Sequence, residues 1–224
     1  MSIFKDLMQL WKSEDLLSQA WEESYQMLTL SREMCIQAIR KLHEHDNLTT
    51  LRALKDRDVE INAFQKNVRR KVVTHFSIKQ DVSNLSSGLV LINMVVDIER
   101  IGDYSKNIVD LAMNYTGSFH VEAISQELHE IETEVEDRFD KTLEAIHTQD
   151  SEVARQLYLS YKELISEKSD RIVNSIIAGE LTYDTGATTA AVALYSRYLK
   201  RIGGHLKNIT TTLVNPVEAI GYIH

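Results

Sequence analysis

The sequence predicts an all-α protein of six long helices, arranged as two tandem, pseudo-symmetric three-helix bundles. Three observations lead to this prediction. The chain of 224 residues contains a single proline, Pro216, so no earlier residue interrupts a helix in the way that proline does. No segment sustains the alternation of apolar and polar residues typical of a strand, and Asn-Gly and Asp-Gly hairpin turns are absent. Finally, a segment of the first half recurs in the second half.

The first predicted helix covers residues 13–47, because apolar and small residues recur there with a period of seven. This period places them on one face, and the small residues allow a neighbouring helix to approach closely. The pattern therefore predicts the seam of a helical bundle. Its members are Trp21, Leu28, Cys35 and Leu42, with Leu17, Ser24, Ser31 and Ala38 between them.

Two further helices complete the first half. Asn47, followed by threonines at 49 and 50, predicts a break and a new N-cap, from which a second helix runs to about Phe76. A third helix is expected over residues 81–115, and Gly117 follows it as a stop.

The second half repeats this plan. A fourth helix is expected over residues 121–147, and a fifth runs from a cap at Asp150 to Ala178, where Gly179 ends it. A sixth helix begins near Asp184 and ends before Pro216. The predicted divisions of the chain are an N-terminal segment (1–12), a first repeat (13–117), a second repeat (118–215) and a C-terminal tail (216–224).

The N-terminal segment is amphipathic, with charged residues set between Ile3, Phe4, Leu7, Met8 and Trp11. It lacks the continuous apolar stretch of a signal peptide, and no uncharged apolar run in the chain approaches the roughly 18 residues of a membrane span. We expect the segment to pack on the bundle, with a dimer contact or a membrane surface as alternatives. The lone cysteine, Cys35, cannot form an internal disulfide, which also favours the cytoplasm.

The composition argues against nucleic acid as a partner, because the formal net charge is −8. One basic run consists of Lys66, Arg69, Arg70 and Lys71. We expect it to be a solvated helix face, with a docking patch for an acidic partner or anionic lipid as the alternative. No glycine-rich phosphate loop, catalytic triad or cysteine motif is present, so the chain is not expected to be an enzyme.

The internal repeat is clearest between residues 97–108, DIERIGDYSKNI, and residues 198–209, YLKRIGGHLKNI. The helix-disfavouring glycine recurs at the matched positions Gly102 and Gly203, which suggests a close helix contact or a crowded site at both places. A weaker echo relates Asp58 and Asn62 to Asp170 and Asn174. The chain therefore reads as a duplicated three-helix unit.

Two carboxylates of the repeated segment continue an apolar stripe. The stripe advances in steps of three and four residues and consists of Leu85, Leu89, Ile92 and Val96, followed by Glu99 and Asp103. If it faces the core, the two carboxylates are buried one turn apart and repel each other, which costs roughly several kcal/mol. A bound cation, a basic side chain or exposure to water must then compensate.

A metal ion is one such compensation, since helical bundles hold metals by gathering carboxylates from several helices. Glu99 and Asp103 would be joined by Asp58 and Asn62 of the second helix. This oxygen-rich set suits a divalent or trivalent ion such as Mg, Ca, Mn or Fe, and Zn stays open as well. Asp97 lies off the stripe and is expected at the surface or behind the ligands.

The second copy of the motif has lost both carboxylates. Lys200 stands at the place of Glu99 and Gly204 at the place of Asp103, so this half is not expected to bind metal through the motif. We expect the ammonium of Lys200 to take over part of the cation's role, facing Asp170.

The segment DIERIGDYSKNI resembles the signature of the PhoU family of phosphate-uptake regulators, and the likeness extends through the duplicated layout over nearly the whole chain. The resemblance implies a cytoplasmic homodimer of PhoU- or spectrin-like helical units that binds metal through Glu99 and Asp103. Asp58 falls where the family's second helix contributes acidic residues, whereas Lys200 and Gly204 depart from the family pattern. The resemblance also implies a role in repressing phosphate-starvation signalling, between a phosphate transporter and a sensor histidine kinase at the inner face of the membrane.

Two alternatives to a metal-binding regulator stay open. One is a metal-free helical scaffold, which predicts that Glu99 and Asp103 pair with basic residues of neighbouring helices. The other is a carboxylate-bridged dimetal oxidoreductase, suggested by a single Glu-x-x-His sequence at Glu144 and His147. Such sites use this motif on two helices, and a solvated helix terminus is the simpler explanation of His147.

Overall fold

The computed structural model describes residues 15–44, 47–79, 84–115, 117, 122–148 and 150–215, with the side chains of 122–125 excepted. The predicted N-terminal segment and C-terminal tail therefore lie outside the described residues. Within the described ranges every regular element is a helix and no strand occurs, which confirms the predicted fold class. None of the described helices is both long and apolar enough to cross a membrane.

The first half contains helices α2 (Leu16–Glu44), α3 (Leu48–Asp56), α4 (Asp58–Lys79) and α5 (Leu85–Asn114). The predicted second helix is thus divided into α3 and α4 by a break at Arg57. The predicted cap is confirmed, because the Asn47 side chain accepts a hydrogen bond from the Thr50 amide at 3.0 Å.

The second half contains α6 (Glu122–Thr148), α7 (Ser151–Tyr161), α8 (Lys168–Ile177) and α9 (Gly186–Val214). A π-helical turn, η1 (Lys162–Glu167), joins α7 to α8, so the two form one long rod. Asp150 caps α7 through the amides of Glu152 and Val153, as predicted. Gly179 adopts the left-handed conformation, φ 73°, just after the end of α8.

The bundle seam predicted in the first helix is confirmed. All eight of its members lie in the buried face of α2. The serines at the small positions bond within their own helix, since Ser24 Oγ donates to Ala20 O at 2.7 Å and Ser31 Oγ to Met27 O at 2.9 Å. Their polar atoms are therefore satisfied while α4 and α5 pack closely against α2.

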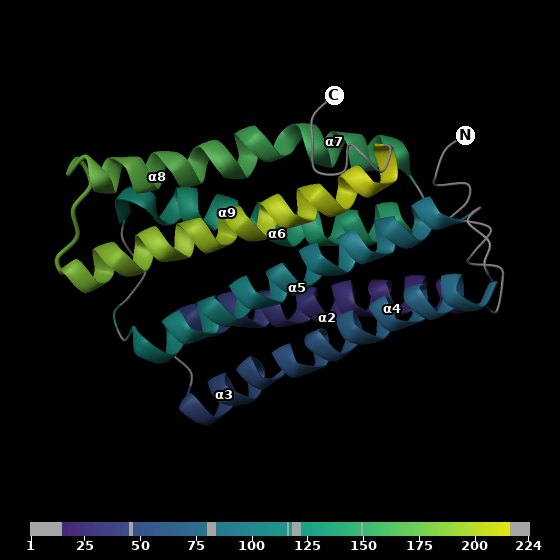
Figure 1. Cartoon of the computed structure of the whole chain (residues 1–224). Coiled ribbons are helices and arrows are strands. Elements are labelled where there is room, and N and C mark those ends of the chain that lie inside the picture. The colour runs from purple at the N-terminus through teal and green to yellow at the C-terminus, as the bar shows by residue number, and fades with distance from the viewer. Residues whose placement is uncertain are drawn as a thin grey trace.

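The two halves lie one above the other, with the first half in purple to teal and the second in green to yellow (Figure 1). Their main contact joins the two motif helices, α5 and α9. Two contacts there are related by the repeat: Tyr104 lies against Tyr198, and Asp97 against His205. α4 lies at the edge of the first half that faces away from the second half (Figure 1). On one side, which we call the open side, the α4–α5 pair is therefore not covered by another described helix.

Candidate functional site

Each repeated glycine marks a close helix contact, as expected from the sequence. A Cβ atom on Gly102 of α5 would lie 2.9 Å from Ile61 Cδ1 of α4. A Cβ atom on Gly203 of α9 would lie 2.7 Å from Ile165 Cδ1 of η1. Since real Cβ atoms do not approach carbon atoms so closely, alanine at either crossing would force the isoleucine side chain to shift, and glycine lets the two helices pack at this distance. The same contact thus positions the motif helix against its neighbour in each half.

Beside the first crossing, the predicted residues of α4 and α5 come together around Lys106. Its ammonium donates to Asp58 Oδ2 at 3.0 Å and to Asp103 Oδ1 at 3.1 Å. Asn62 Nδ2 donates to the same oxygen of Asp58 at 3.0 Å. We call Asp58, Asn62, Glu99 and Asp103 the acidic cluster.

Arg100 supplies the second cation of this site. Its Nη1 donates to Asp103 Oδ2 at 3.1 Å, and its Nε lies 3.7 Å from Glu99 Oε2. Glu99 and Asp103 are therefore paired with basic residues, as the scaffold interpretation predicts. That interpretation was wrong about their source, because Arg100 and Lys106 belong to α5 itself and only the bond from Lys106 to Asp58 crosses between helices.

The stripe that led to this site does not face the core. Leu85 is 43% exposed and Leu89 42% exposed, and the face of α5 that is buried contains Leu91, Met94, Ile98 and Ile101 instead. The assumption of two carboxylates in core positions was therefore wrong. Both water and basic side chains compensate the carboxylates. Each has an ion-pair partner, and each is partly exposed, with side-chain exposures of 13% for Asp58, 19% for Glu99 and 31% for Asp103.

The electrostatics of the acidic cluster are those of partly buried like charges. Burial raises the pKa of Glu99, and the charges of Asp103 and Asp58 raise it further. Burial acts against the charge of Lys106, but the hydrogen bonds to Asp58 and Asp103 outweigh it and raise the pKa of the ammonium. Asp58 Oδ1 is buried and accepts no hydrogen bond from the part of the chain that the structure describes. A carboxylate oxygen is thus left for a further donor or cation.

The donor set is chemically suited to a hard cation, but its arrangement is that of a lysine site. No group of three or more His, Cys, Asp or Glu side chains in the described ranges is placed so that it could hold a metal ion. Around Asp58 and Asp103 the reason is that both carboxylates turn toward the Lys106 ammonium. A metal would have to take the place of this ammonium.

In the second half, lysine and tyrosine side chains take the place of the carboxylates. Lys200 Nζ bonds both oxygens of Asp170, each at 2.6 Å, which confirms the expected contact. The space beside Gly204 is taken by Tyr161, whose hydroxyl donates to Lys200 O at 3.2 Å. Lys207, the counterpart of Lys106, lies over the ring of Tyr161, and burial lowers the pKa of its ammonium.

The weaker echo between Asp58 and Asp170 is not a structural equivalence. At the two glycine crossings, Ile61 and Ile165 are equivalent. Asp58 precedes Ile61 by three residues, whereas Asp170 follows Ile165 by five, so the two aspartates are not equivalent. Asp58 accordingly contacts Lys106, which follows its glycine, and Asp170 contacts Lys200, which precedes its glycine. The similar spacing of Asp and Asn in the two helices has no shared structural basis.

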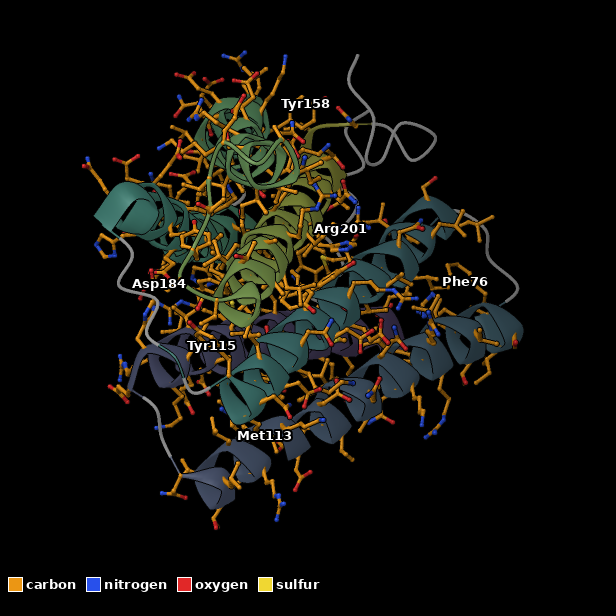
Figure 2. The ribbon with its side chains drawn as sticks, turned by 90° about the vertical axis from the view of Figure 1, so that its left-hand side faces the viewer. Phe76, Met113, Tyr115, Tyr158, Asp184 and Arg201 are labelled. Atoms are coloured by element: carbon orange, nitrogen blue, oxygen red, sulfur yellow. The ribbon has the colours of Figure 1, made fainter. Side chains whose placement is uncertain are left out.

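Asp97 was expected at the surface or behind the ligands, and it lies instead in the contact between the halves. Its Oδ1 bonds His205 Nδ1 at 2.7 Å and accepts from Asn208 Nδ2 at 3.1 Å. Nearby, Arg201 Nε donates to the hydroxyl of Tyr104 at 3.1 Å, where α9 runs beside α5 (Figure 2). The alignment of the two motif copies contains a signal for this contact. Asp97 matches Tyr198 and Tyr104 matches His205, so the residues that meet between the halves occupy the same two motif positions.

The residues of the oxidoreductase alternative do not join this site. Glu144 is exposed near the end of α6, and the ring of His147, one turn later, lies 6.2 Å from that of Tyr25 in α2. Neither contacts the acidic cluster in the described part of the chain. The pair is accounted for as a solvated helix terminus.

Comparison with known proteins identifies the family. The model of the PhoU domain matches this chain twice, over residues 25–112 and 128–213, which together make up most of its length. The chain belongs to the PhoU family. The two matches correspond to the two halves joined at α5 and α9, so the duplication is that of the PhoU domain itself.

Similar proteins agree with this assignment. A phosphate-specific transport system accessory protein PhoU homolog of Caulobacter vibrioides is 25% identical over 158 residues, which span 68% of this chain and 66% of the relative. The crystal structure of PhoU from Pseudomonas aeruginosa aligns with a TM-score of 0.79 at 20% identity, covering 89% of this chain and 95% of that one. PhoU from Streptococcus pneumoniae aligns with a TM-score of 0.77 at 17% identity, over 88% and 93%. At these identities the two structures establish the PhoU fold.

Proposed function

We propose that this chain is an accessory regulator of phosphate transport that acts through protein contacts rather than catalysis. The observation that carries the proposal is the duplicated PhoU domain, supported by a relative named as an accessory protein of a phosphate-specific transport system. The proposed setting is the cytoplasm, at the inner face of the membrane. The proposed assembly is a homodimer that meets a phosphate transporter, a sensor histidine kinase or both, and represses phosphate-starvation signalling.

Within this function, we propose that the acidic cluster exchanges the Lys106 ammonium for a divalent or trivalent metal ion. Asp58, Glu99 and Asp103 would hold the ion, with Asn62 supporting Asp58. Such an ion would neutralise the carboxylates and link α4 to α5. Two observations support the exchange: Asp58 Oδ1 is buried without a hydrogen bond from a described residue, and burial together with the charges of Asp103 and Asp58 raises the pKa of Glu99, so a cation bound here would favour both carboxylates.

The runner-up is a metal-free scaffold in which Lys106 is the permanent counter-ion. It is favoured by the bonds of Lys106 to Asp58 and Asp103 and by the second half, where Lys200 serves Asp170 in a comparable way. The two alternatives differ in one consequence. Removing Lys106 strengthens metal binding if the ammonium and a metal compete, and only weakens the fold if they do not.

The metal proposal is tested by titrating the metal-free protein with Mn²⁺ in a calorimeter and by elemental analysis of the protein as purified. We expect the Glu99→Gln, Asp103→Asn double variant to lose binding and Lys106→Met to bind more tightly than the natural chain. Lys207→Met is the matched control, because it removes the corresponding lysine of the second half, which lies over the rings of Tyr158 and Tyr161 instead of between two carboxylates. Absence of bound metal from both the natural chain and Lys106→Met would establish the scaffold instead.

The regulatory role is tested in cells from which the gene has been deleted. Uptake of radioactive phosphate in phosphate-rich medium should rise in the deletion strain and return to normal when the natural chain is restored. Restoration by the Glu99→Gln, Asp103→Asn variant would place the regulation outside the acidic cluster. Unchanged uptake in the deletion strain would contradict the role in phosphate transport.

A further inference from the structure

The open side of the α4–α5 pair contains an apolar groove that no described side chain fills. Its volume is about 370 Å³, and it is lined by Val72, Val73, Phe76, Ser77, Leu85, Gly88, Leu89 and Ile92. Phe76 lies between the ends of α4 and α5 (Figure 2), and its ring packs directly on Gly88, so this glycine belongs to the floor. Val73 on the rim is 60% exposed, and Leu85 and Leu89 are exposed as well.

This groove includes the exposed part of the stripe that sequence analysis had assigned to the core. The exposed part of these side chains does not stabilise the bundle by burial, because it remains in water. An exposed apolar patch rimmed by polar residues is characteristic of an interaction surface. The groove is therefore best explained by an occupant outside the described residues.

A group of cations lies next to the groove. Lys66, Arg69 and Arg70 are exposed on α4, one to two turns before Val73, and none of them forms an ion pair or hydrogen bond with a described residue. Lys71 differs, because it bonds Glu23 Oε1 at 2.9 Å. Three of the four members of the basic run are thus available to an external anion, in a chain whose net charge is −8.

We propose that the groove and these three cations form one docking site for an amphipathic helix of a partner protein that carries acidic residues beside its apolar ridge. Helices that bind in this way insert side chains spaced three or four residues apart into a groove between two helices. The cations lie three to seven residues before Val73, which is about 5–10 Å along α4. The partner should therefore carry its carboxylates one to two helical turns from its apolar ridge.

Charge and shape argue against two other occupants of the groove, the chain's own N-terminal segment and a lipid bilayer. The N-terminal segment of this chain is apolar enough, but it carries Lys5 and Lys12 against the single acid Asp6, so it does not complement the cations. A lipid bilayer accepts side chains that project from a surface, whereas the apolar surface here is recessed between two helices. None of the residues that line the groove belongs to the acidic cluster, whereas the charge of one of the three cations, Arg69, acts on Glu99 of that cluster and favours its ionised form.

The test measures binding of two fluorescent helical peptides to the full chain by anisotropy. Both peptides carry leucines with a spacing of three and four residues, and one continues with three glutamates where the other has three lysines. We expect the glutamate peptide to bind and the lysine peptide to bind at least about tenfold more weakly. Leu89→Glu should weaken the glutamate peptide by about tenfold or more, as loss of a central anchor does. The double variant Lys66→Glu, Arg70→Glu leaves Arg69, which acts on Glu99, unchanged; it should weaken the glutamate peptide to the same extent, and salt should no longer weaken its binding.

Two matched controls keep the result specific. Leu159→Glu introduces the same charge at an exposed leucine of α7, and the double variant Arg40→Glu, Arg52→Glu changes the net charge equally on α2 and α3. Neither should alter binding. Equal binding of the two peptides, or none of either, would overturn the proposal.

The remaining outcomes would assign the groove to another occupant and would also overturn the proposal. Binding of phosphatidylglycerol vesicles that is lost in Leu89→Glu, without peptide binding, would assign it to a membrane. Peptide binding that appears only when Leu7 and Trp11 are replaced by serine would assign it to the chain's own N-terminal segment. Dimers in light scattering that dissociate in Leu89→Glu, again without peptide binding, would assign it to a second copy.

Discussion

Replacing Gly203 by alanine tests whether the close crossing of α9 and η1 is what requires glycine in the repeated motif. The added methyl group would lie 2.7 Å from Ile165 Cδ1 and 3.3 Å from Ile165 Cγ2. Alanine favours a helix over glycine by about 0.5–1 kcal/mol, but overpacking a core costs about 1–3 kcal/mol. We therefore expect the free energy of unfolding to fall by about 0.5–2 kcal/mol.

The adjacent glycine supplies the control. A Cβ atom on Gly204 would lie 3.1 Å from the hydroxyl oxygen of Tyr161 and 3.6 Å from its Cζ, a looser contact than at Gly203, so the helix propensity of alanine, about 0.5–1 kcal/mol, should offset more of the cost of Gly204→Ala. Urea unfolding followed by circular dichroism at 222 nm measures both variants. Ile165→Val removes the clashing methyl group. It should therefore lower the free energy of unfolding less in the Gly203→Ala variant than in the natural chain. The reasoning is refuted if Gly203→Ala proves as stable as Gly204→Ala, or if the two changes are additive.

Three other predictions concern charged groups. Lys200→Met should lower the free energy of unfolding by about 0.5–1.5 kcal/mol in urea, since Asp170 loses both hydrogen bonds from Lys200 and keeps the one from Arg197; an unchanged melting temperature would contradict this. The hydrogen bond that His43 donates to Glu132 outweighs burial and raises the pKa of His43. The stability that His43 adds is therefore complete below its unfolded pKa of about 6.5 and is lost as pH rises through the raised value. Urea midpoints should fall across that window in the natural chain, and a His43→Gln variant that falls equally would exclude the pair as the cause. Arg138→Met should cost about 3–5 kcal/mol in urea, because the side chain is fully buried and bonds Leu157 O, Glu134 and Ser160. Arg138→Lys should recover only part, and full recovery would show that the charge alone matters.

Local sequence signals were sufficient for the helices and their ends. The seven-residue period of α2 depends on residues within one helix, and all its members are buried. The caps at Asn47 and Asp150 and the left-handed Gly179 are likewise set by side-chain chemistry within a few residues. The duplication added what local signals lack, because two equal motifs predicted two equal helix crossings.

The orientation of α5 could not be predicted in this way. This helix packs against α2, α4 and α9, so it buries a wide face, and apolar residues also remain on its open side. Periodicity detects an apolar stripe but does not distinguish one that meets another helix of the same chain from one that meets a partner. Leu85 and Leu89 lie on the open side, where we propose that a partner binds. The stripe that begins with them therefore did not place Glu99 and Asp103 in the core.

The two halves together separate what the fold requires from what it does not. Both keep the glycine crossing and a lysine one turn after it, Lys106 and Lys207. Only the first half surrounds its lysine with carboxylates, and the second packs the same fold with tyrosine rings instead. Since the fold is maintained without them, the carboxylates of the first half are not needed for packing, and the pKa of Glu99 is raised first by burial and then by the charges of Asp103 and Asp58. A group of like charges that the fold could replace is best explained by a binding role, which is why the acidic cluster, rather than its counterpart, is the site to test for metal.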